Sequence, residues 1–154
     1  MVPMRSLHLR LQEYTDCFAE SDPAAALSEI SRKGVEGDIT RDLTEVTLKY
    51  LALALLCAIE EGASRILISS HGDFADSCGL RGATAVQLPK PPAGMARQMI
   101  DIVREITGLE EDSGSSKLIW GVREDQLEID VGVERTSREE ILTLSLTSTK
   151  ERRR

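Results

Sequence analysis

The stretch RDLTEVTLKYLALALLCAIEEG, residues 41–62, decides the fold, because it predicts one long helix that is apolar on two sides. Its two apolar stripes consist of Leu43, Val46, Tyr50, Ala54 and Cys57, and of Leu48, Leu51, Leu55 and Ile59. Such a helix must be covered on both sides, so we expect either a sheet and a second helix around it or a subunit interface on one side. Gly62 predicts its end. Cys57 is interpreted as a small buried hydrophobe.

A polar segment follows this helix and is the first candidate site. An apolar strand is predicted at 65–69, and it leads into the loop SSHGDFADSCGLRG, residues 69–82. His71 is a candidate general base and Cys78 a candidate thiolate nucleophile, with Asp73 or Asp76 orienting the imidazole. Alternatively, the aspartates cap turns, His71 bonds a backbone carbonyl and Cys78 is half-buried. The spacing of these residues fits neither a zinc motif nor a calcium loop, so we predict no metal and no cofactor.

Two further residues suggest an anion-binding or ligand-binding site. Arg81 can hold a carboxylate or phosphate through two parallel hydrogen bonds. Gly94 lies at the start of a predicted helix, where free backbone amides favour an anion. The alternative is that Arg81 pairs with an acidic surface residue and that Gly94 only relieves crowding after two prolines.

The remaining pattern predicts an α+β fold, a small two-layer sandwich in which a mixed sheet of four to five strands packs on the long buried helix and one or two further helices. Residues 5–18 suit either a strand or a helix, and we leave the choice open. Helices are predicted at 23–34 and 94–107, strands at 83–88, 117–122, 127–134 and 141–148, and a polar connector at 110–116. Trp120 is predicted to lie in the core.

Composition narrows the class of protein. The chain has 154 residues, which suits one domain, with a basic tail at about 150–154. Its formal charge of -7 argues against nucleic-acid binding. The longest apolar run, 50–59, is about half of what a membrane-spanning helix requires, so no membrane contact is predicted. The N-terminus lacks the apolar core of a secretory signal, and an odd number of cysteines, 3, favours no disulfide framework, so we expect a soluble cytoplasmic protein.

Four segments of the second half resemble, in order and spacing, the C-terminal domain of the tubulin-like cell-division protein FtsZ. They are RGATAVQL (81–88), MIDIVREI (99–106), KLIWGVRED (117–125) and LEIDVGVERT (127–136). The fragment GDFAD, 72–76, also resembles the loop that precedes that domain. The resemblance implies a small α+β sandwich with a mixed sheet. It would give Asp73 and Asp76 a role at a neighbouring subunit's nucleotide, but the glycine-rich GTP-binding signature of the family is missing, so GTPase activity is not implied.

These observations leave two hypotheses about function. The first is a module that assembles with itself or with a partner, motivated by the two-sided apolar helix and the apolar last strand. A homo-oligomer is expected in that case. The second is an enzyme or binder of a small molecule that uses residues 70–82, with a neighbouring subunit completing the pocket. Whether the chain is an enzyme stays open at this stage.

Overall fold

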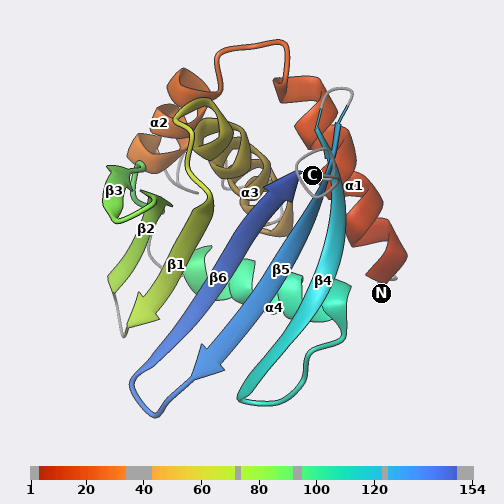
Figure 1. Cartoon of the computed structure of the whole chain (residues 1–154), viewed down its shortest axis with the longest axis vertical. Coiled ribbons are helices and arrows are strands. Elements are labelled where there is room, and N and C mark those ends of the chain that lie inside the picture. The colour runs from red at the N-terminus through yellow and green to blue at the C-terminus, as the bar shows by residue number, and fades with distance from the viewer. Residues whose placement is uncertain (1–3, 34–42, 72–73, 92–94, 123–124, 149–154) are drawn as a thin grey trace.

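The computed structural model describes residues 4–33, 43–71, 74–91, 95–122 and 125–148, and these form two layers (Figure 1). The helices are α1 (Met4–Phe18), α2 (Pro23–Lys33), α3 (Leu43–Glu60) and α4 (Met95–Thr107). The strands are β1 (Arg65–His71), β2 (Phe74–Arg81), β3 (Thr84–Gln87), β4 (Ser113–Val122), β5 (Asp125–Arg135) and β6 (Glu139–Ser148). The α+β class is therefore confirmed. The basic tail at 150–154 lies outside the described residues.

The strands form one sheet of 6 strands in the order β3-β2-β1-β6-β5-β4, and all of the pairs described are antiparallel. The prediction of a mixed sheet with four to five strands is close in strand number. It is wrong in expecting parallel as well as antiparallel pairs of strands. Short connections join neighbours within β1-β2-β3 and within β4-β5-β6, and short connections produce antiparallel pairs. Helix α4 connects β3 to β4, which are the two opposite edges, and it crosses behind the sheet (Figure 1).

Helix α3 is covered by its own chain. Every residue from 46 to 58 except Lys49 is buried, and α1, α2, α4 and β1 all contact this helix. The first of the two arrangements expected for the long apolar helix thus holds, and a subunit interface is not needed to cover it. Cys57 is 5% exposed, and burial raises the pKa of its thiol to about 11, which keeps it protonated.

Residues 4–18 form a helix rather than a strand. Leu7 and Leu11 are 3% and 1% exposed, whereas Leu9 is 58% exposed. Buried residues four positions apart are typical of a helix, and an alternating strand would have buried Leu9 as well. This helix also protects the sheet edge. The amide of Gln12 donates to the Gly121 carbonyl at 2.6 Å and accepts from the Gly121 N–H at 2.9 Å, while the His8 Nε2 lies 3.2 Å from the Ile119 carbonyl. An uncovered edge would expose these backbone groups for pairing with another chain.

Two segments predicted as irregular are strands. Residues 74–81 of the predicted loop form β2, and residues 113–116 of the predicted connector form the first part of β4. Both carry polar residues because one side of each strand faces away from the helices, where burial does not select apolar side chains. Gly62 and Gly108 end α3 and α4 as predicted, with φ angles of 75° and 78°. No helix among the described residues combines the length and apolarity that a membrane span requires.

Candidate functional site

The described helices lie behind one face of the sheet, and none of them lies on the other face (Figure 1). We call this uncovered side the open face. Its outward side chains come from alternate positions of the strands, because successive residues point to opposite sides. They are Ala85 and Gln87 on β3; Asp76, Cys78 and Leu80 on β2; Arg65, Leu67, Ser69 and His71 on β1; Glu139, Ile141, Thr143 and Ser145 on β6; Gln126, Glu128, Asp130, Gly132 and Glu134 on β5; and Ser113, Ser115, Lys117, Ile119 and Gly121 on β4.

The centre of the open face is formed by β1, β6 and β5, whose register places residues in rows across the sheet. One row contains Arg65, Ser145 and Asp130. The next contains Leu67, Thr143 and Gly132. A third contains Ser69, Ile141 and Glu134.

Apolar side chains are only partly shielded on this face. Leu67, Leu80 and Ile141 are half-buried, and Ile119 is 45% exposed. Neighbouring side chains on the same face shield them in part, but no second layer formed by described residues covers them. The open face therefore combines an incompletely covered apolar centre with charged residues on β1, β4 and β5.

The structure separates the residues of the predicted catalytic group. His71, Asp76 and Cys78 share the open face, but Cys78 pairs with Leu67, which lies four residues from His71 along β1. At about 3.4 Å per residue, His71 and Cys78 are thus about 14 Å apart along the strands, too far for a base to activate a thiol directly. Asp73 lies outside the described residues. Burial, and then the charge of Asp76, raise the pKa of the Cys78 thiol, which disfavours the thiolate.

Only one residue of the predicted anion-binding pair, Arg81, is among the described residues. Arg81 is exposed at the end of β2, and its Cδ lies 3.7 Å from the position that a Cβ at Gly62 would take, so its stem packs near the end of α3. Gly94 lies outside the described residues. No cluster of three or more metal-ligating side chains occurs in the described ranges.

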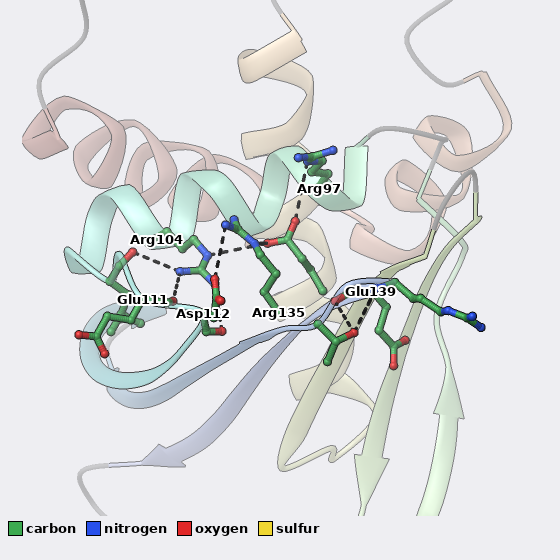
Figure 2. A network of polar contacts seen from close by, with 10 residues as sticks. Arg97, Arg104, Glu111, Asp112, Arg135 and Glu139 are labelled. Carbon is green, nitrogen blue, oxygen red and sulfur yellow. Dashed lines mark hydrogen bonds and ion pairs between the residues drawn. The ribbon is translucent and has the colours of Figure 1, made fainter.

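A polar network that the sequence did not predict lies where α4 meets the ends of β5 and β6 (Figure 2). Arg104 is 8% exposed and donates to the Glu111 carbonyl at 2.7 Å. Its Nε lies 3.9 Å from Glu140 Oε2, and Arg135 Nε donates to the same oxygen at 2.9 Å. Arg97 reaches the other carboxylate oxygen of Glu140 at 3.8 Å. The network thus holds the chain after α4 against the sheet, and we interpret it as structural.

Asp101 provides a test of the electrostatics near this network. The Asp101 side chain is exposed at the surface, but partial desolvation, and then the charge of Glu140, raise the pKa of its carboxyl, so its charged form is slightly less favourable in the folded state than in the unfolded one. Stability is therefore lost as pH rises from the ordinary carboxyl pKa through the raised one. We expect Asp101→Asn to raise Tm by about 1–2 °C at pH 7 and by less at pH 4. Thermal unfolding at both pH values measures this, with Glu105→Gln, one turn along α4, as the control; an equal gain at both would contradict it.

Sequence reasoning missed the open face and the polar network for different reasons. The alternation of apolar and polar residues on β5 and β6 was recognised, but the sequence does not show that the polar side lacks a second layer. Arg104 stands between apolar residues of α4, and its partners are loop carbonyls and a residue of another strand. Such long-range pairing leaves no periodic signal.

The chain is thus a two-layer α+β protein with helices on one side of an antiparallel sheet and an open face on the other. No protein-family model and no curated protein matches this chain. The resemblance of its second half to FtsZ stays a prediction. The antiparallel sheet differs from the mixed sheet that this resemblance implied.

Proposed function

We propose that this protein is a self-assembling module and that the open face binds a second copy of the chain. The observation that carries the proposal is the open face itself, an antiparallel sheet surface with half-buried Leu67 and Ile141 near its centre and Ile119 at 45% exposure. Leu67 and Ile141 are diagonal neighbours, because Leu67 pairs with Thr143, whereas Ile119 pairs with Glu128 at one side of the face. Partly exposed apolar side chains surrounded by polar ones are typical of interaction sites. The long helix, which first suggested assembly, no longer contributes to this argument.

The size of the open face suits a stable interface. The sheet has 6 strands, which at about 4.8 Å between neighbours span about 24 Å. Strands β1 and β5 contain 7 and 11 residues, so the face extends about 24 to 37 Å along the strands. The flat area is then on the order of 600–900 Å², comparable to the roughly 800 Å² that each partner contributes to a standard interface.

The alternative, an enzyme or binder that uses residues 70–82, gains no support from the geometry. Cys78 and His71 are separated, and the thiol of Cys78 has a raised pKa. The polar residues of this surface do not point toward one common position where a small molecule could react. Such a surface is better suited to contact with the broad surface of another protein.

Sedimentation velocity over a range of protein concentrations tests the proposal. We expect a concentration-dependent shift from monomer to dimer for the unaltered chain. Ile141→Lys should weaken the dimer about tenfold or more, because it places a charge at the centre of a desolvated surface. Leu9→Lys is the matched control, since Leu9 is 58% exposed on α1, a helix on the covered side of the sheet.

Thermal unfolding of both variants shows whether the fold is retained. A chain that stays monomeric at all concentrations would remove the proposal. So would equal weakening of the dimer by Ile141→Lys and Leu9→Lys, because the contact would then not depend on the open face.

A further inference from the structure

Two copies of the chain can meet through their open faces in more than one orientation, and the residues of the face select one. We infer that the two-fold axis runs parallel to β6, so that β1 of each copy lies over β5 of its partner. This inference rests on the proposed function. It adds the arrangement of the interface and the residues that determine it.

The rows of the sheet define which residues then meet. Strands β1 and β5 are the two neighbours of β6, so a rotation of 180° about an axis along β6 exchanges their positions. Arg65 and Asp130 both pair with Ser145, so they share a row, and Arg65 of each copy comes to lie opposite the partner's Asp130. Two sheets that pack face to face cross at about 30°, and contacts next to the axis are displaced least by this angle.

Charge favours this axis. Arg65 is exposed and forms no ion pair with another residue that the structure describes. Strand β5 carries three outward acids, Glu128, Asp130 and Glu134, and Lys117 of β4 is the cation paired with two of them, at 3.0 Å from Glu128 and 3.6 Å from Asp130. A partner that brings an additional arginine against this strand reduces its excess of negative charge.

Other orientations bring like charges together. An axis along β5 would place the acids of this strand against the same acids of the partner. An axis across the strands would also stack β5 on β5. An axis along β1 would place Arg65 against itself. The axis along β6 also places one acid against its counterpart, Glu139, but this residue stands at the start of the strand, where the crossing angle separates the two copies most. Because like charges that face each other in an interface cost several kcal/mol, the other orientations, which oppose charges nearer the centre, are disfavoured relative to the axis along β6.

Gly132 supplies an independent observation. It stands in the interior of β5 on the open face, where a glycine weakens a strand. Its own chain does not require the glycine, because a Cβ there would meet only the Cβ of Thr143, at an ordinary contact distance of 3.9 Å. With the axis along β6, the partner's Leu67 lies over Gly132, since both residues pair with Thr143. The missing side chain then leaves room for a leucine from the other copy.

Mixing two charge-reversed variants tests the arrangement. Arg65→Glu alone and Asp130→Arg alone should each weaken the homodimer about tenfold or more, because each creates two like-charge contacts per dimer. A mixture of the two variants should restore the dimer to near the original Kd, because the introduced glutamate then faces the introduced arginine and the remaining arginine faces the remaining aspartate. Sedimentation equilibrium measures the three Kd values.

Gly132→Val adds a second readout that a purely structural role would not give. A valine suits a strand and has room in its own chain, so we expect Tm to stay unchanged or to rise. The same substitution should raise the Kd of the dimer about tenfold or more, because it collides with the partner's Leu67.

The outcomes separate the two levels of the proposal. Recovery of the dimer in the mixture, together with weakening by Gly132→Val, supports the axis along β6. No recovery, while Ile141→Lys still breaks the dimer, overturns this axis and leaves the proposed function in place. A chain that is monomeric at every concentration overturns both.

Discussion

Trp120→Ala is expected to lower the free energy of unfolding by about 3–5 kcal/mol, one of the largest effects of a single substitution in this chain. Trp120 on β4 is 2% exposed. Its indole Nε1 donates to Thr15 Oγ1 on α1 at 2.9 Å, and that hydroxyl in turn donates to the Leu11 carbonyl at 2.8 Å. Alanine removes the ring, leaves a cavity between α1 and the sheet, and breaks the buried connection between them.

Urea unfolding of variants measures this prediction. Trp120→Phe keeps most of the ring volume and loses the indole N–H, so a smaller loss of about 1–2 kcal/mol is expected. Ile119→Ala is the neighbouring control on the open face, and its 45% exposure predicts a change of at most about 0.5–1 kcal/mol in the monomer. If Trp120→Ala cost no more than Ile119→Ala, the packing of α1 against β4 would be wrong.

The elements that could be predicted from the sequence are those with apolar residues on a buried side and polar residues on an exposed side. The helix ending at Gly62, the helix ending at Gly108 and the alternating strand around Ile129 were all predicted. In each, apolar residues recur at the period of the element because one side is buried. The core position of Trp120 follows from the same logic and is confirmed.

The elements that could not be predicted carry polar residues on a regular backbone. Strand β2 contains Asp76, Ser77 and Cys78, and its polarity suggested a loop. The two-residue link Gly-Asp at 72–73, between this segment and the strand before it, is a sequence signal for a hairpin. Polar residues do not argue against a strand where one face of the sheet is open. Residues 113–116 were missed for the same reason.

The candidate site shows the same limit more strongly. Reactive residue types gathered within a short segment suggested chemistry at His71 and Cys78, but strand geometry places neighbours in sequence on opposite faces and separates the rest along the strand. What the sequence could not show is which face lacks a second layer. That depends on which side of the sheet α4 crosses and on which side the described helices pack, and both are properties of the whole chain.

Arg104→Ala is the second substitution with a large expected effect, a loss of about 3 kcal/mol in the free energy of unfolding. Arg104 is 8% exposed and bonds the Glu111 carbonyl at 2.7 Å, while its Nε faces Glu140 at 3.9 Å. The alanine variant leaves the Glu111 carbonyl without its donor. It also removes one of the three arginines around the Glu140 carboxylate, which is itself 8% exposed. Arg135 still donates to Glu140 at 2.9 Å, which keeps the loss below the upper end for a broken buried pair.

Arg97→Ala is the matched control, because Arg97 lies on the same helix and reaches the same carboxylate at 3.8 Å, but its side chain is 71% exposed. Exposed ion pairs contribute about 0–1 kcal/mol, so this variant should unfold at nearly the original urea concentration. Glu140→Gln should fall between the two, since a neutral amide still accepts one hydrogen bond while the arginines lose their counter-charge. Equal losses for Arg104→Ala and Arg97→Ala would mean that burial does not strengthen this network, and the structural role assigned to it would fail.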